Sequence, residues 1–226
     1  MRTARSATAV LSVLAALLSP TAAHAAATER HAAPGDSVTL PVRDALAALP
    51  VQTENRTGYE RTKFRHWTDA DRDGCNTRLE VLKAEAVSAP VQGPNCVLTG
   101  GSWYSPYDDR YLDSASMLDV DHLVPLAEAW DSGASQWTAK ERELYANDLD
   151  DARDLIAVSA ASNRSKADKD PSEWMPPYAG YRCQYDTDWV ADKMRWGLSI
   201  DATERDVLTQ QLVGCPDWPI TVTLAR

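Results

Sequence analysis

Two stretches of this chain constrain its fold more than any other feature: DVDHLVP at residues 119–125 and DLIAVSAASNRSKADK at residues 154–169. The first stretch ends a predicted strand. The second contains LIAV, an apolar run typical of another short strand, after which either Ser159 or Ser162 can begin a helix as its N-cap residue. Strand, loop, strand and helix in this order form a ββα unit, so we expect an α+β protein.

Both stretches carry side chains that are suited to hydrolysis. Asp121 and His122 are adjacent, and a carboxylate can hold a hard cation while a neutral imidazole accepts a proton from water. The second stretch adds an amide and three cations: Asn163, Arg164, Lys166 and Lys169. If the two stretches close on each other, the sequence predicts a metal ion and a phosphodiester between them.

DVDHLVP followed by SNRSKADKDPSE resembles the HNH, or ββα-metal, nucleases, and in particular the secreted HNH endonucleases related to the C-terminal domain of GmrSD restriction enzymes. This resemblance implies a ββα core at about residues 116–170. It also implies that His122 is the general base and that Asp121 and Asn163 hold the metal, which is Mg²⁺, or Mn²⁺ in its place.

Further side chains receive roles in this site. The position that orders the loop carrying the histidine falls on Asp154, where the motif has Asn, and a carboxylate accepts hydrogen bonds but cannot donate them. Lys166 lies on nearly the same helical face as Asn163 and is expected to hold a flanking phosphate in the catalytic site. Other substrate contacts are predicted at Arg164, Lys169 and Arg78, with His66 in reserve.

The N-terminus is typical of a secretory signal peptide. Arg2 and Arg5 precede an apolar run of 12 residues, and an AxA arrangement ends at Ala25, where cleavage is expected. A membrane-spanning helix needs roughly 20 apolar residues, so the sequence predicts a secreted protein without membrane association. We expect a flexible leader at residues 26–40 and a single nuclease domain at residues 41–226.

The chain is acidic and contains four cysteines. Without its first 25 residues the formal net charge changes from −10 to −12, which repels polyanions, so phosphate contact requires a local basic cluster or a metal. An even cysteine count in an exported chain indicates two disulfides. We favour Cys75–Cys96 and Cys183–Cys215 because each closes a local loop. A zinc site is the alternative, although no CxxC or HxxxH spacing supports it.

The segment DADRDGCNTRLE matches the calcium-loop pattern of alternating oxygen ligands followed by a terminal Glu. Its ligands for a structural Ca²⁺ would be Asp69, Asp71, Asp73 and Glu80. The alternative is an acidic turn that stabilises a helix at residues 79–86 through the helix dipole.

Apolar residues at helical spacing predict further helical segments at residues 42–49, 126–130, 138–149, 188–197 and 201–212. Thr138 with Glu141, and Asp201 with Glu204, are expected to form capping pairs. The turn-rich residues 90–113 are expected to be irregular structure pinned by a disulfide.

These features predict a secreted, metal-dependent HNH endonuclease that acts as a monomer and hydrolyses DNA with little sequence preference, with RNA left open as a substrate. One alternative is a catalytically silent exported binding module stabilised by calcium and disulfides, which the acidic charge favours. A hydrolase of another phosphodiester or of a cell-wall polymer ranks last, because the chain lacks a paired-carboxylate or Ser-His signature.

Overall fold

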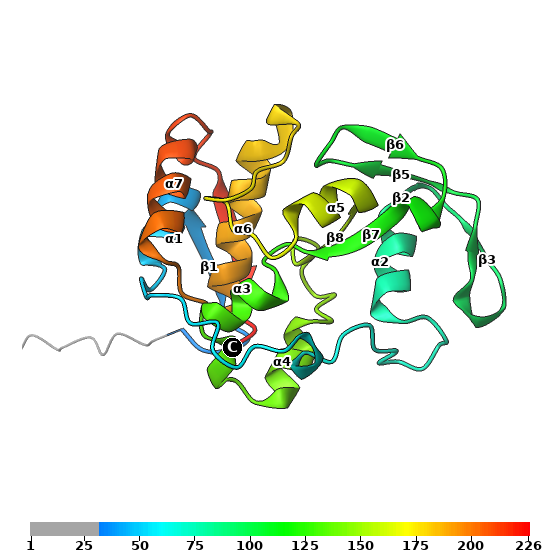
Figure 1. The fold of residues 1–226 in the computed structure, drawn as a ribbon, viewed down its shortest axis with the longest axis horizontal. Helices are drawn as coiled ribbons and strands as arrows, with labels where there is room; N and C mark the ends of the chain where they lie inside the picture. Colours follow the sequence, from blue (N-terminus) through cyan, green and yellow to red (C-terminus); the bar gives the residue numbers. More distant parts are fainter. Residues whose placement is uncertain (1–31) are drawn as a thin grey trace, which may run out of the picture. The chain divides into compact units, whose positions relative to one another are not determined.

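Strands β7 (Leu118–His122) and β8 (Leu155–Ser159) pair antiparallel in the computed structural model, which describes residues 32–226 (Figure 1). Helix α5 (Ala160–Lys166) follows β8 directly, because the hydroxyl of Ser159 accepts a hydrogen bond from the first turn of the helix and caps it. The predicted ββα unit is present, and the α+β class is confirmed. The predicted signal peptide and the first part of the predicted leader lie outside the described residues.

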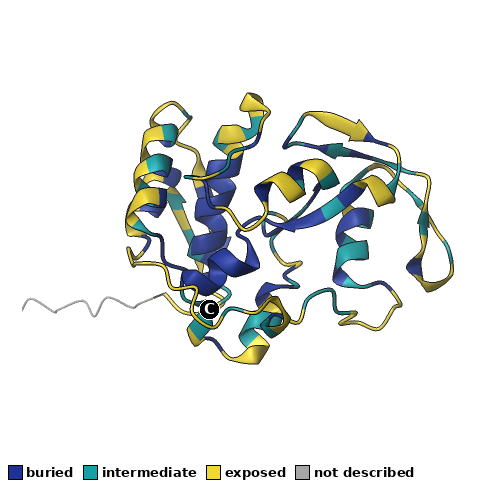
Figure 2. Ribbon diagram, viewed as in Figure 1, coloured by how far each residue is buried: buried dark blue, intermediate teal, exposed yellow. Residues whose placement is uncertain are grey.

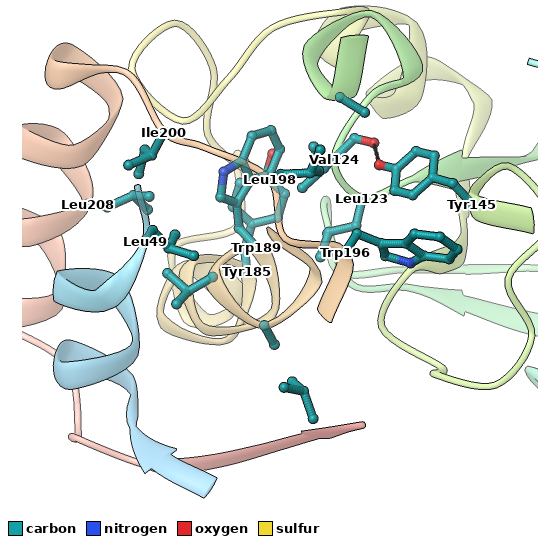
Figure 3. Packing of buried hydrophobic residues seen from close by; sticks show 14 of the residues in the cluster. Leu49, Leu123, Val124, Tyr145, Tyr185, Trp189, Trp196, Leu198, Ile200 and Leu208 are labelled. Atoms are coloured by element: carbon teal, nitrogen blue, oxygen red, sulfur yellow. Dashed lines mark hydrogen bonds between the residues drawn. The ribbon is translucent and has the colours of Figure 1, made fainter. Parts of the chain in front are cut away.

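On one side of this unit, three helices pack with a two-stranded ribbon (Figure 1). These elements are β1 (Ser37–Pro41), α1 (Val42–Ala48), α6 (Arg182–Trp196), α7 (Ala202–Val213) and β9 (Pro219–Thr223). β1 and β9 pair antiparallel, so the beginning and the end of the described chain meet. Helix α6 is largely buried from Tyr185 onward, while its first turn is mostly exposed (Figure 2). It contributes Tyr185, Trp189 and Trp196 to the larger apolar core (Figure 3).

On the other side, short strands surround a second apolar core. The elements are α2 (Thr77–Ala84), the sheet β2–β5–β6 (Ala86–Ser88, Ser102–Ser105, Arg110–Leu112) and the hairpin β3–β4 (Val91–Gln92, Leu98–Thr99). The prediction of irregular structure at residues 90–113 was therefore wrong. The turn residues of this segment separate very short strands. Gly101 is one of them: its φ is 84°, and a Cβ at this position would lie 2.9 Å from the Trp103 ring, so only glycine fits there.

The remaining helices connect these parts: α3 (Leu126–Asp131), α4 (Ala139–Tyr145) and the 3₁₀ turns η1 (Arg61–Lys63), η2 (Pro94–Cys96), η3 (Ala115–Met117), η4 (Ala134–Gln136) and η5 (Ala179–Tyr181). Thr138 and Glu141 form the predicted capping box of α4. Asp201 caps α7 as predicted, but the Glu204 carboxylate instead accepts from the Trp189 indole N–H. The Glu204 N–H donates to the Asp201 carboxylate at 3.2 Å, so the predicted capping pair forms in one direction.

The structure departs from the sequence prediction at the leader and agrees with it at the cysteines. Residues 37–40 were expected to be flexible, but they belong to β1 because Val38 and Leu40 pack against the larger core. The disulfides Cys75–Cys96 and Cys183–Cys215 are both present. No helix in the described part of the chain is long and apolar enough to cross a membrane.

Candidate active site

A pocket of about 330 Å³ opens where β7, α5 and η1 meet. The predicted residues Asp121 and His122 line it from β7, and Asn163 and Arg164 line it from α5. Arg61 of η1 lines the same pocket. The two stretches that the sequence singled out therefore meet at one pocket.

The His122 ring is held at one edge and on one face. Its Nε2–H donates to the Ala146 carbonyl at 3.0 Å, and since a carbonyl can only accept, Nδ1 carries the free lone pair. The Trp67 indole stacks on the ring with the centroids 5.1 Å apart. Burial lowers the pKa of His122 to about 3, so the imidazole is neutral at neutral pH. The free and oriented Nδ1 lone pair can accept a proton from water, and the lowered pKa makes this imidazole a weaker base than a free histidine, whose pKa is 6.5.

Asp121 is buried beside two donors. The Lys166 Nζ lies 2.8 Å from its Oδ2, and the Tyr107 hydroxyl donates to the same oxygen at 2.7 Å. Lys166 also donates to the His122 carbonyl at 3.0 Å. Burial raises the pKa of Asp121 and lowers the pKa of Lys166, and each group opposes the shift of the other. At 2.8 Å we treat them as an ion pair, which fixes one carboxylate oxygen and leaves Oδ1 outside these hydrogen bonds.

Asn163 directs its amide group toward β7. Its Nδ2 donates to Oδ2 of Asp119 at 3.2 Å, and the Arg164 Nε lies 3.4 Å from the same oxygen. The Asn163 Oδ1 has no hydrogen-bond donor among residues 32–226. Asp119 and Asp121 lie on the same face of β7, since alternate residues of a strand point the same way. Carboxylate and amide oxygens are the ligands that Mg²⁺ and Mn²⁺ prefer, so these residues fit a divalent cation.

The Asp154 side chain lies in a different environment from the one expected. Its carboxylate accepts hydrogen bonds from Arg195 and Trp196 of α6, both at 3.2 Å. The loop after His122 is instead held by the Asp154 main chain, whose carbonyl accepts from the Leu123 N–H at 3.0 Å. A main-chain contact of this kind does not depend on whether the side chain is Asn or Asp.

Lys166, Arg78 and Lys169 were also predicted to meet the substrate, and the structure contradicts this at Lys166. Lys166 is fully buried, so its ammonium cannot reach a flanking phosphate and instead positions Asp121. Arg78 donates to the Leu118 carbonyl at 2.9 Å and braces the start of β7. Lys169 is exposed and donates to the Ser165 carbonyl in the last turn of α5, which leaves it free to meet a substrate.

Sequence reasoning missed four residues that shape the site: Tyr107, Trp67, Arg61 and Asp119. Tyr107 lies in the turn-rich segment and no motif marks it. Residues 59–67 mix basic and aromatic side chains, and this mixture is the sequence signal available for Trp67 and Arg61. His66, held in reserve, packs edge-on against Trp67 with the centroids 5.5 Å apart.

The Asp-rich loop brings three exposed carboxylates together. Ligand atoms of Asp69, Asp71 and Asp73 can lie within 4.8 Å of one another. Glu80 is also near Asp73, but the Lys83 ammonium lies 3.2 Å from its carboxylate. The following helix is capped by the Asn76 side chain rather than by an acid. A structural Ca²⁺ at this loop stays a prediction.

A ββα unit that brings a histidine, an aspartate and an asparagine to one pocket defines the class of HNH-type nuclease domains. A family model described as "GmrSD restriction endonucleases, C-terminal domain" matches residues 78–211, more than half of the chain. The chain belongs to this family, and the resemblance noted in the sequence is confirmed.

A relative supports the assignment to a secreted branch. A protein of Arthroderma benhamiae (strain ATCC MYA-4681 / CBS 112371), named "Uncharacterized secreted protein", is 41% identical over 171 residues, which cover 75% of this chain and 82% of the relative. No solved structure matches the chain. Because the relative is named as secreted and the two disulfides suit an oxidising compartment, the prediction of secretion is confirmed.

Proposed function

We propose that this protein is a secreted, monomeric endonuclease that hydrolyses DNA phosphodiester bonds with little sequence preference and requires a divalent metal. The His122 geometry carries this proposal: the ring is neutral, its Nε2–H is tied to Ala146, and it lines the same pocket as Asn163. Asp121 and Asn163 would hold Mg²⁺, or Mn²⁺ in its place.

A phosphodiester resists attack because it is anionic, so hydrolysis needs an activated water and positive charge near the phosphate oxygens. When bound, the divalent cation supplies part of that charge. His122 takes the proton of the attacking water at Nδ1, while Ala146 keeps the ring in one orientation. Lys166 holds Asp121, and Asp119 holds the amide of Asn163. Cleavage would leave 5′-phosphate and 3′-hydroxyl ends, as the family resemblance implies.

A plasmid-nicking assay with Mg²⁺, Mn²⁺ or Ca²⁺ tests this proposal. His122→Ala should lower the nicking rate by roughly 10²–10⁴-fold, the usual effect of losing a general base. His66→Ala is the matched control, because it removes a neighbouring imidazole that does not line the pocket. Full nicking activity of His122→Ala, or of the wild type in excess EDTA, would contradict the proposal.

The exposed carboxylates of Asp69, Asp71 and Asp73 favour a second candidate function. In it the protein is an exported binding module that holds Ca²⁺ at this loop and keeps the ββα unit as a scaffold. Calorimetry with Ca²⁺ beside the nicking assay separates the two. Calcium binding without nicking under any of the three cations would favour the binding module.

A further inference from the structure

Four cations lie in the segment before the Asp-rich loop: Arg56, Arg61, Lys63 and Arg65. Three of them have acidic partners within 4.0 Å: Arg56 with Asp131, Lys63 with Glu60, and Arg65 with Glu143. Within residues 32–226, Arg61 has no carboxylate at that distance, and it is the one of these four cations that lines the pocket. The cation without an acidic partner is thus the one that faces the candidate active site.

The backbone that carries Arg61 is anchored in the core. Phe64 follows η1, is fully buried, and its N–H donates to the Arg61 carbonyl at 3.1 Å. The Phe64 ring packs edge to face against Trp130 and Tyr145, with centroids 6.4 and 6.2 Å apart. An exposed guanidinium on an anchored backbone can be presented to a ligand at a small cost in ordering entropy.

The surroundings of Arg61 differ from those of Arg164, the other arginine that lines the pocket. Arg164 is also exposed at the pocket, but its charge is shared with Asp119 at 3.4 Å. Asp168 lines the pocket as well and adds negative charge. The net charge of this protein repels polyanions. A phosphate group that enters the pocket would nevertheless find a cation without an acidic partner, Arg61.

We infer that Arg61 binds a phosphate group of the nucleic-acid strand at this pocket, donating hydrogen bonds to its non-bridging oxygens. The inference rests on the proposed nuclease function and adds a substrate contact from a segment outside the ββα unit. Guanidinium suits this role because its planar donors match two oxygens of one phosphate. The phosphate would then lie between Arg61 and the Asn163 side of the pocket.

Binding of a short DNA duplex in EDTA, measured over a range of salt concentrations, tests the contact without cleavage. Arg61→Ala should weaken binding roughly tenfold and reduce the slope of log K against log salt by about one. Arg65→Ala is the matched control, because its side chain is 75% exposed on the same segment and has an acidic partner; it should change both quantities little. Arg61→Lys should restore part of the affinity. Unchanged thermal unfolding of Arg61→Ala would confirm that the variant is folded.

The two proposals fail in different ways. Equal affinity and salt slope for Arg61→Ala and Arg65→Ala, with a wild type that nicks DNA, would overturn the Arg61 contact and leave the nuclease function intact. A wild type that binds DNA through Arg61 but never nicks it would support the contact and overturn the nuclease function. A wild type that does not bind the duplex would overturn the contact.

Discussion

Two lysines of this protein share a residue type and a degree of burial but differ in their acidic surroundings. Lys166 and Lys193 are both fully buried, and both lie over the Trp189 ring, at 5.9 and 5.7 Å from its centroid. The Lys193 Nζ contacts two carboxylates, Glu128 at 2.7 Å and Glu204 at 2.8 Å. Lys166 contacts a single carboxylate, at the edge of the candidate active site.

The number of acidic partners decides the direction of each pKa. Burial disfavours both ammonium groups, but the two carboxylates outweigh it and raise the pKa of Lys193. At Lys166 burial outweighs the single partner Asp121 and lowers the pKa. Lys193 is therefore a structural charge that joins α3, α6 and α7, whereas Lys166 is an incompletely compensated charge that positions Asp121.

Glu85 extends this comparison to a half-buried carboxyl group without a counterion. One of its oxygens accepts from the Ala157 N–H at 2.8 Å, and within the described part of the chain no cation lies within 4.0 Å of it. Burial raises the pKa of Glu85 to about 7. Within residues 32–226, Lys193, Lys166 and Glu85 thus have two, one and no charged partners. If the number of partners sets the free-energy cost of removing the charge, the loss of stability should decrease in that order.

The largest effect is expected for Lys193→Met. This substitution leaves Glu128 and Glu204 buried without their cation, and breaking a buried ion pair in this way typically costs about 3–5 kcal/mol. Urea unfolding measures the loss, and Lys169→Met, at an exposed site, should stay within about 0.5 kcal/mol of wild type. A loss below about 1 kcal/mol would show that the two carboxylates do not depend on Lys193.

The sequence could predict the ββα unit and the meeting of Asp121, His122 and Asn163, because strand and helix patterns place these residues locally. It could not predict the burial of Lys166. Helical spacing puts that lysine on nearly the same face as Asn163, but only the tertiary structure shows that Trp189, from a helix later in the chain, covers it.

The same limit explains the error at Asp154. Its side-chain partners, Arg195 and Trp196, lie more than forty residues away in sequence, and no local pattern indicates such a contact. The motif position predicts that Asp154 holds the loop after His122. Because donors from α6 engage the Asp154 side chain, the main-chain carbonyl holds the loop instead.

Lys166→Met should cost less stability than Lys193→Met but more activity. Asp121 keeps its hydrogen bond from the Tyr107 hydroxyl, so we expect a loss of about 2 kcal/mol, the scale of one charged hydrogen bond. Because Asp121 is no longer fixed, kcat for nicking should fall roughly 10²-fold while KM changes little. Tyr107→Phe, which removes the other donor, is the control and should have a smaller effect on kcat. A rise in KM with kcat unchanged would show that Lys166 contacts the substrate.

Below pH 4.5 the smallest effect of the three is expected for Glu85→Gln, and the pH dependence of its effect is what distinguishes this variant. The pKa of Glu85 is raised from 4.5 to about 7 on folding, so the stabilisation from its bound proton is complete below 4.5 and is lost as the pH rises to about 7. The unfolding free energy of wild type should fall through this window by up to about 1.4 kcal/mol per pH unit from this group. Glutamine keeps an oxygen for the Ala157 N–H but does not titrate, so the variant should gain stability relative to wild type as the pH rises. A difference in unfolding free energy between the two proteins that stays constant from pH 4.5 to 7 would show that the pKa of Glu85 is not raised on folding. Glu85 would then no longer serve as the example of a group without a charged partner.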